Sequence, residues 1–390
     1  MKAVAPLEDV PLQVPGHIEF DIDAKELRRL ISAVAVSYPT QPIMDVTRHI
    51  VVEAETGRLK LTSTNLSTFS TASTGKVTIK ESGRVGLFGN QLLRMRGPLA
   101  QETIVSVKVS DSVAHFSTPT SHWGFRLNDL RMFPKTPDVV DEMFGTALDR
   151  VKFIEAVEAV HRAAATDLIR HSLMIVDVTD QTIRASDGTR YQQVYTPWWP
   201  KGLDVGIPSG AVSRVLQFCK RAESEMISFR ASDQYLGFLT EEDAFLVAKP
   251  AAKFAMMDDL ILKPALVSCV QAFGVDLGEF ASALSRVTVV SDQATNVVSL
   301  EIGDVTAKVS TEDRMGNSAS KLVPLKSSDL PEPRTLVFNL KYLTDMLAMC
   351  GNDADGIFFI GPDKKTKKTP LLYRGVSKGI IGVLNQMRLT

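Results

Sequence analysis

One pattern occurs three times along the chain and limits what it can fold into: a short strand, a helix of roughly three turns, and usually another strand. The copies begin VGLFGNQLLRMRGPLAQ at residue 85, VGIPSGAVSRVLQFCKR at residue 205 and VFNLKYLTDMLAMC at residue 337. A second helical pattern precedes each copy, starting at Phe20, Ala147 and Gly274, and alternating strand sequence follows it. Corresponding points are about 120 to 130 residues apart. The repeat therefore has the size of a domain and exceeds that of a solenoid repeat.

The repeat predicts the domain organisation of the 390-residue chain. We expect domains at 1–138, which includes a short N-terminal extension, 139–262 and 263–390, because proline and acidic residues interrupt the pattern in RMFPKTPDVVDEM and MMDDLILKPA. Each copy combines two one-sided amphipathic helices with antiparallel-type strands, an arrangement typical of helices laid on one face of a sheet. The predicted fold class is α+β, with six helices packed on three repeated antiparallel sheet units.

Composition places the chain among globular proteins. Hydrophobic residues make up 44% and charged residues 23%, with no run of 18 apolar residues and no secretory leader. The cysteines, Cys219, Cys269 and Cys350, are far apart and show no CxxC spacing, so neither a disulfide framework nor a thiolate zinc site is predicted. We expect a soluble protein of the cytoplasm.

Motifs for catalysis are scarce. The six histidines show no HExxH pattern and no pairing at i, i+4, which favours surface or core roles over metal ligation: His17, His49, His115, His122, His161 and His171. No GxGxxG, P-loop or GxSxG motif occurs. A hydrolase built on Ser186 and Asp187 would need a positioned base, which the sequence does not supply. We therefore expect no enzyme activity, no cofactor and no metal, and keep a hydrolase as the weak alternative.

Charge is distributed unevenly although the net charge is only −1. Basic residues outnumber acidic ones on the six predicted helices, and the remainder of the chain is acidic. One interpretation is an ordinary solvated helix surface. The other is a shared helical surface that faces a polyanion. The candidate polyanion-binding residues under the second interpretation are Lys25, Arg28, Arg29, Arg94, Arg96, Arg162, Arg214, Lys220 and Arg221.

Specific motifs accompany the repeat. ASDGTRYQQVYTP in the second copy, VFNLKYLTDML in the third and MRL at 387–389 occur in an order and spacing that resemble the bacterial beta sliding clamp family, over residues 17 to 390. The resemblance implies three similar domains per chain, and two chains closed head to tail into a ring. Helices line the hole, and double-stranded DNA threads it without sequence preference. It also implies the processivity subunit of the replicative DNA polymerase; the alternative is a clamp-like factor of a phage or plasmid that acts in transcription or repair.

The resemblance further implies a hydrophobic pocket between the second and third domains, where DNA polymerase and clamp loader dock short linear peptides. Matching positions are Gly188, Arg190, Tyr191, Asn339, Tyr342, Val383, Leu384, Met387, Arg388 and Leu389. Without the resemblance, Asp187 and Gly188 indicate only a turn, and the terminal segment is equally typical of a last strand. Thr189 stands where the family commonly has histidine, and Thr390 extends beyond the usual end, so partner preference is left open.

Ring closure in the family pairs the outer strand of the first domain with the start of the third domain of the other chain. The matching residues here are Phe125 and Leu127, with Val289 and Val290 on the opposite side. Each of them could instead face the core of its own domain. The resemblance predicts a homodimer.

Overall fold

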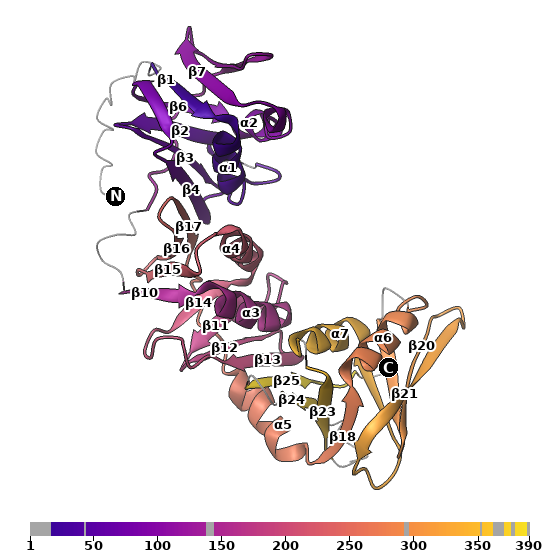
Figure 1. Ribbon diagram of the computed structural model, residues 1–390. Helices are drawn as coiled ribbons and strands as arrows, with labels where there is room; N and C mark the ends of the chain where they lie inside the picture. Colours follow the sequence, from indigo (N-terminus) through magenta and orange to yellow (C-terminus); the bar gives the residue numbers. More distant parts are fainter. Residues whose placement is uncertain are drawn as a thin grey trace, which may run out of the picture. The chain divides into compact units, whose positions relative to one another are not determined.

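The structure is a computed structural model that describes residues 17–42, 44–137, 144–291, 296–351, 353–361, 370–375 and 379–387 (Figure 1). Its first part comprises β1 (Glu19–Asp23), α1 (Ala24–Val34), η1 (Asp45–Arg48), β2 (His49–Glu55), β3 (Arg58–Thr64), β4 (Thr68–Thr74), β5 (Val77–Glu81), β6 (Gly83–Phe88), α2 (Gly89–Arg94), η2 (Pro98–Gln101), β7 (Ile104–Ser110), β8 (Val113–Ser117) and β9 (His122–Arg126).

The second part comprises β10 (Phe144–Asp149), α3 (Arg150–Val160), η3 (His161–Ala163), η4 (His171–Leu173), β11 (Ile175–Thr179), β12 (Thr182–Ser186), β13 (Arg190–Tyr195), β14 (Val205–Pro208), α4 (Ser209–Arg221), β15 (Met226–Ala231), β16 (Tyr235–Leu239) and β17 (Asp243–Ala248). The third comprises η5 (Asp258–Leu262), α5 (Lys263–Ser268), β18 (Gln271–Asp276), α6 (Leu277–Val287), β19 (Val297–Ile302), β20 (Thr306–Glu312), β21 (Ser318–Ser328), β22 (Arg334–Asn339), α7 (Leu340–Met349), β23 (Asp355–Ile360), β24 (Leu371–Arg374) and β25 (Ile380–Leu384).

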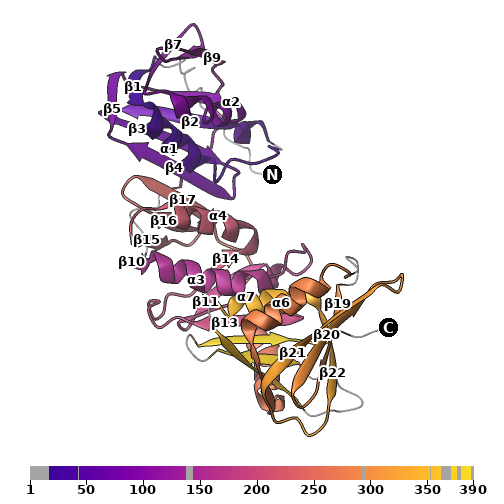
Figure 2. The same cartoon turned by 45° about the vertical axis from the view of Figure 1, so that its right-hand side comes forward.

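The same order of elements therefore occurs three times: a strand, a helix, a run of strands, a second helix and three closing strands. The first helix of each copy packs on equivalent strands. Helix α1 lies on β3 and β4, α3 on β12 and β13, and α6 on β20 and β21, as the views in Figures 1 and 2 illustrate. All strand pairs among the described residues are antiparallel, which agrees with the predicted α+β class.

An aspartate begins the first helix of every copy. The Asp23 carboxylate accepts hydrogen bonds from the backbone N–H groups of Lys25 at 2.8 Å and Glu26 at 3.2 Å. Asp149 and Asp276 cap α3 and α6 through the N–H groups three residues later, at 3.0 Å and 2.8 Å. Such a carboxylate satisfies donors that have no partner within the helix and also favours the positive helix end. These three aspartates explain where the helices begin.

The strands form three sheets, in the orders β5-β1-β7-β8-β9, β10-β15-β16-β17-β4-β3-β2-β6 and β14-β11-β12-β13-β25-β24-β23-β18-β21-β20-β19-β22. Two strand pairs join one copy to the next. Strand β4 of the first copy pairs with β17 of the second, and β13 of the second copy pairs with β25 of the third. We call these pairs the two junctions.

The chain divides into two compact units, one with the residues up to Ala147 together with Gln217–Ala248, the other with Leu148–Leu216 and the residues from Lys249 onward. The middle copy contributes to both units, because its strands pair with the first copy at one junction and with the third copy at the other. The domain boundaries near residues 138 and 262 therefore stay a prediction.

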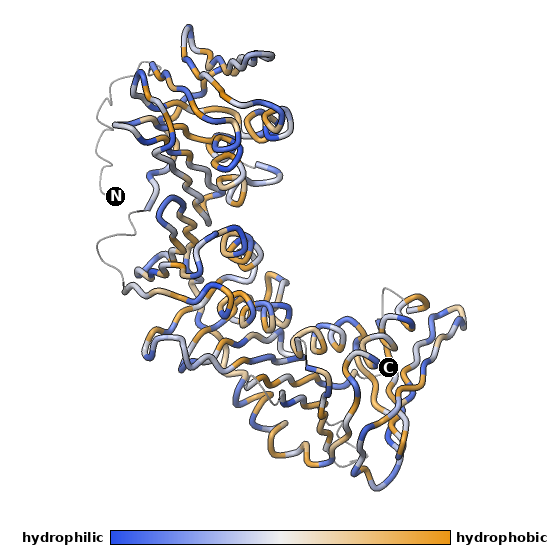
Figure 3. The backbone as a smooth tube through the Cα atoms, viewed as in Figure 1, coloured by the Kyte–Doolittle hydropathy of each residue, from blue (hydrophilic) through white to orange (hydrophobic). Residues whose placement is uncertain are grey.

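The core of the first unit illustrates how the helices are held. Leu27, Leu30 and Ile31 of α1 are buried against strand residues such as Leu59 and Leu61 of β3. Hydrophobic and hydrophilic residues alternate along many strands in Figure 3, as expected when only one face of a sheet is buried.

Two details of the sequence prediction were wrong. The second helix of the first copy ends at Arg94 instead of running for three turns, and a 3₁₀ helix follows from Pro98. Gly97 and Pro98 explain the early end, because glycine is a poor helix former and proline lacks the N–H that a helix needs. The segment at Met256–Ala265, predicted as a break, contains the π-helix η5 and the start of α5. Pro264 is tolerated there because it lies in the first turn of α5.

The three cysteines are free and buried. Within the described part of the chain, no helix is long and apolar enough to cross a membrane.

Candidate peptide-binding site and helix cations

The turn between β12 and β13 is shaped by its own side chains. The Asp187 carboxylate accepts hydrogen bonds from the N–H groups of Thr189 at 2.9 Å and Arg190 at 3.1 Å. Gly188 has φ +86°, a conformation that favours glycine. The Ser186 hydroxyl donates to the Arg190 carbonyl at 2.6 Å. The predicted turn is confirmed, and it fixes the position of Arg190 at the start of β13.

Arg190 is a buried hub in the second unit. Its Nε lies 3.1 Å from Asp187 Oδ2 and its Nη1 lies 2.7 Å from Asp345 Oδ2. The guanidinium also lies over the Tyr342 ring, 4.0 Å from the centroid, and Nη2 donates to the Arg162 carbonyl. A buried charge is tolerated when such partners surround it. Arg190 thus connects the β12–β13 turn to α7.

The start of α7 and the C-terminal segment meet next to this hub. Asn339 begins the helix, because its side-chain oxygen accepts from the Tyr342 N–H at 3.1 Å. The N–H of Asn385 donates to the Thr189 carbonyl at 3.1 Å, and that of Met387 donates to the Val337 carbonyl at 2.9 Å. The sequence-predicted residues Arg190, Tyr342 and Asn339 are therefore in one chain of contacts. Gly188 belongs to the turn that holds Arg190, and Met387 is bonded to β22, the strand that ends at Asn339. Arg388 and Leu389 lie outside the described residues.

Three other predicted pocket residues are buried. Tyr191, Val383 and Leu384 are each at most 1% exposed. The Tyr191 hydroxyl lies 2.7 Å from both Gln193 Oε1 and Asp258 Oδ1, and burial is the main cause that raises the pKa of Tyr191. Tyr191 and Val383 belong to one apolar cluster with residues of η4, η5, α5 and β24. They can support a binding surface from below, but they are not exposed on it.

Three exposed apolar side chains are sequence neighbours of residues in this cluster. Met256 and Leu260 are 73% and 68% exposed, and Val267 of α5 is 81% exposed. Sequence analysis did not identify them, because η5 and α5 were predicted to be a break. It also missed Asp345 as a partner of Arg190, since the two residues are far apart in sequence.

The helix cations fall into three groups. Lys25, Arg28, Arg94 and Arg96 form no ion pair with any described carboxylate. Lys25 and Arg94 are exposed, and Arg28 and Arg96 are half-buried. These four come from α1 and the segment of α2, which pack together in the first unit. Their charges are available to a ligand.

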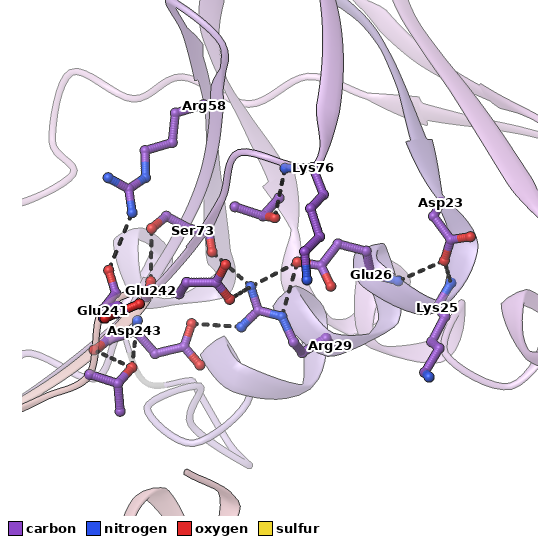
Figure 4. A network of polar contacts seen from close by, with 12 residues as sticks. Asp23, Lys25, Glu26, Arg29, Arg58, Ser73, Lys76, Glu241, Glu242 and Asp243 are labelled. Carbon is purple, nitrogen blue, oxygen red and sulfur yellow. Dashed lines mark hydrogen bonds and ion pairs between the residues drawn. The ribbon is translucent and has the colours of Figure 1, made fainter. Parts of the chain in front are cut away.

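Arg29 differs, because carboxylates surround it (Figure 4). Its guanidinium lies 3.0 Å from Glu26, 3.1 Å from Glu242 and 2.9 Å from Asp243, and it donates to the Ser73 carbonyl at 2.7 Å. Burial alone would lower the pKa of Arg29, but the ion pairs outweigh it and the pKa is raised. The charge of Arg29 is thus largely neutralised within the protein.

Arg221 joins the same group. It donates to the Ser32 carbonyl at 2.7 Å and lies 3.5 Å from Asp243. Burial lowers the pKa of Arg221, Asp243 opposes this shift, and the nearby Arg29 adds to it. A hollow of about 1210 Å³ opens beside these residues, with mixed charges along its wall. It lies in the first unit, whereas the predicted peptide-binding residues belong to the second.

The remaining candidate cations belong to the second copy. Arg162 is exposed and lies 3.9 Å from Asp345, while Arg214 donates to the Gly210 carbonyl of its own helix at 3.3 Å. Lys220 is exposed at the end of α4.

The predicted interface residues differ in exposure. Phe125 and Leu127 are partly buried and pack against the core of the first unit. Val289 is 85% exposed, and Val290 is half-buried. Strand β9, which contains Phe125, is the last strand of its sheet.

Repeated copies of helices on antiparallel strands, joined through strand pairs, define the fold of DNA sliding clamps. No family model matches the chain. It is 22% identical over 337 residues to the beta sliding clamp of Synechococcus elongatus, which covers 83% of this chain and 87% of that protein.

Solved structures agree on the fold. The C. crescentus beta sliding clamp matches with a TM-score of 0.84 at 18% identity, over 96% of this chain and 100% of that one. The DnaN sliding clamp of Bartonella birtlesii, bound to griselimycin, gives 0.84 at 19% identity with the same coverage. The Bacillus subtilis DNA polymerase sliding clamp gives 0.84 at 15% identity, again with the same coverage. The predicted resemblance and fold class are confirmed.

Proposed function

We propose that the protein is a DNA sliding clamp: two chains form a closed ring around duplex DNA and tether the replicative polymerase for processivity. The observation that carries this proposal is the sliding-clamp fold over 96% of the chain, from the first copy to the third. The function is topological and needs no catalytic residue. We also propose the three domains with the boundaries given above, and a cytoplasmic protein.

The free strand edges support ring closure. At the two junctions, β4 pairs with β17 and β13 with β25. The third copy has an equivalent of β4 and β13 in the first half of β21, whose described pairing is with β20 alone. The first copy has an equivalent of β17 and β25 in β9, whose only described partner strand is β8. Unpaired edges invite pairing with another chain. We therefore propose a third junction, from β21 of one chain to β9 of its partner.

The repeat also predicts the register of this third junction. Phe69 pairs with Leu246 at the first junction and Tyr191 with Val383 at the second. Phe69 and Tyr191 are the first paired residues after their hairpin turns, and Ser318 has this position after the turn that follows Glu312. By the same comparison of hairpins, Gly124 corresponds to Leu246. We expect Ser318 to pair with Gly124 of the partner chain.

DNA binding is proposed for the uncompensated helix cations, chiefly Lys25, Arg28, Arg94 and Arg96. A ring that encloses DNA needs a diffuse positive lining, because strong phosphate contacts would hinder sliding. Arg29 and Arg221 contribute less under this proposal, because carboxylates already engage them. Arg162, Arg214 and Lys220 remain further candidates.

A retention experiment tests encirclement. The protein is loaded with its clamp loader and ATP on nicked circular DNA, and free protein is removed by gel filtration in high salt. Protein should remain on the circle and leave once a restriction enzyme linearises the DNA. A linear duplex with both ends blocked by streptavidin should retain it. Equal retention on circular and open linear DNA would contradict the proposal.

A charge reversal tests the lining. The double change Arg28→Glu and Arg96→Glu should weaken binding to linear DNA in low salt, and each lost phosphate contact should lower the dependence of log affinity on log salt by about 1. Lys201→Glu makes the same change of charge at an exposed turn and should leave DNA binding unchanged.

Peptide docking is proposed at the hub and the adjoining apolar cluster. Gly188, Arg190, Asn339, Tyr342 and Met387 would form the polar and aromatic side, with Arg388 and Leu389 continuing it. Tyr191 and Val383 of this cluster would support it from below, and so would the buried Leu384. The partners would be short hydrophobic peptides of the DNA polymerase and the clamp loader. A phage or plasmid clamp that acts in transcription or repair would have the same ring, so partner identity distinguishes the two.

A further inference from the structure

We propose that His115 and His122 form a binding site for a divalent transition-metal ion, of the class of Zn²⁺ or Ni²⁺, on the outermost hairpin of the first unit. This site is additional to the proposed clamp function and does not rest on it. Clusters of three or more metal-binding side chains are absent from the described residues. The proposed site has two protein ligands, and water would occupy the other positions.

The register of β8 and β9 brings the two rings together. Ser117 pairs with His122, and His115 pairs with Gly124, so the histidines are diagonal neighbours on one face of the hairpin. His115 Nδ1 lies 3.3 Å from His122 Nε2. The rings stack at a centroid distance of 5.3 Å with an angle of 24° between their planes. The buried residues Ala114 and Phe116 alternate with His115, so the histidines face away from the core.

The nitrogen separation suits one shared metal ion. Zinc binds imidazole nitrogen at about 2.0 to 2.1 Å, usually with tetrahedral geometry. Two nitrogens of such a site are then about 3.3 to 3.4 Å apart, by the tetrahedral angle. The 3.3 Å separation between the rings matches this value. A metal ion would replace the hydrogen bond between the stacked rings, and the rings would rotate until both nitrogen lone pairs point at the ion.

Ser117 supplies a partner for the second nitrogen of His122. Its hydroxyl oxygen lies 3.0 Å from His122 Nδ1. If Nδ1 carries the proton and donates to Ser117, Nε2 presents a lone pair toward His115. Metal-binding histidines are commonly oriented in this way by an oxygen acceptor on the other ring nitrogen. The hairpin therefore contains both the ligands and an orienting group.

Within one chain, the described surroundings leave access to the metal position. Gly124 has no side chain to crowd this position. A Cβ there would lie 3.9 Å from His115 Nδ1 and 3.3 Å from a Val113 side-chain carbon. Lys108, opposite His115 on β7, is the nearest cation in the register, and its ammonium lies 2.9 Å from Glu19. This ion pair reduces the repulsion that Lys108 would otherwise exert on a bound cation.

Calorimetric titration of the full chain, purified without a polyhistidine tag, tests the site. With Zn²⁺, and separately with Ni²⁺, we expect saturable binding of one ion per chain that EDTA reverses. His115→Ala and His122→Ala should each abolish it, and Ser117→Ala should weaken it by about tenfold. His171→Ala removes an exposed histidine elsewhere and should leave binding unchanged.

Thermal unfolding without metal shows whether each variant is folded, and His122→Gln provides a second variant with a polar side chain. Loss of binding in folded His115→Ala and His122→Ala, with wild-type binding in His171→Ala, supports the site. Undiminished binding in the double variant His115→Ala and His122→Ala would overturn it, as would the absence of saturable binding to the wild-type chain.

Discussion

Arg190 shows how a residue of the SDGTR motif contributes to structure and to the proposed site. Two carboxylates neutralise it, at 3.1 Å and 2.7 Å, while its guanidinium covers the Tyr342 ring. The sequence motif predicted the turn and the resemblance predicted Arg190 and Tyr342. Neither could predict Asp345 as the second partner, because that contact depends on how α7 packs against the second copy.

Tyr342 provides the first prediction. Tyr342→Ala should weaken binding of a hydrophobic polymerase peptide by about 1 to 2 kcal/mol, because an aromatic edge at the site is lost. The starting affinity should be about micromolar, since a short flexible peptide is ordered on binding. Fluorescence anisotropy with a labelled peptide measures both values. Tyr235→Ala removes another half-buried tyrosine, in the first unit, and should have no effect. Equal losses in both variants would contradict a role for Tyr342 in docking.

His49 provides a prediction about pH. Burial is the largest cause that lowers the pKa of His49 from its ordinary 6.5. The unfolded chain therefore binds a proton at His49 more readily than the folded chain does. The stability that neutral His49 contributes is present above pH 6.5 and is lost as the pH falls through the lowered pKa. Urea unfolding at pH 7.5 and pH 5.5 should show a smaller loss of stability for His49→Gln than for the wild type. His171→Gln, at an exposed site, should behave like the wild type; if His49→Gln did so too, the prediction would fail.

At the scale of elements, the sequence predicted secondary structure best where the signal is local to the segment itself. The strand–helix order of each copy was predictable, and so was the amphipathic stripe of α7. The length of α2 and the existence of α5 were not, because α2 ends at Arg94, ahead of Gly97 and Pro98, despite its apolar pattern, and α5 tolerates Pro264 in its first turn. The contact between His115 and His122 could not be predicted either, since it follows from strand register and not from spacing along the chain.

The aspartate caps provide a prediction at this scale. Asp23→Ala should destabilise the protein by about 1 kcal/mol, because two N–H groups of α1 lose their acceptor. Asp23→Asn should cost much less, since asparagine is an equally good cap. Urea denaturation of the two variants gives the comparison. If both variants lost the same stability, the charge of Asp23 would matter more than its capping bond.

At the scale of the whole molecule, the two junctions use equivalent strands, and this repetition predicts the third. The sequence revealed the threefold repeat, but not that the middle copy shares its strands between two compact units. That division depends on strand edges, which carry no sequence motif of their own.

A crosslink tests the register of the third junction. Thr120 and Leu322 should face each other across it, because Glu242 and Ser73 occupy the equivalent positions at the first junction and are joined there by a backbone hydrogen bond of 2.8 Å. Directly opposed residues have Cα atoms about 4.5 to 5.5 Å apart, within the range of a disulfide. The double variant Thr120→Cys and Leu322→Cys should form a covalent dimer under mild oxidation, visible on non-reducing gels. Thr120→Cys with Val305→Cys, exposed but away from the proposed pair, should not.

The burial of all three native cysteines has a practical consequence for such work. Burial raises the pKa of Cys350 to about 12 and also raises that of Cys269, while Cys219 is fully buried. Thiols react as thiolates and only where reagents can reach them. The folded native chain should therefore be unreactive toward maleimides and fluorescent thiol labels. A cysteine introduced on its surface can then be labelled selectively without first removing the native cysteines.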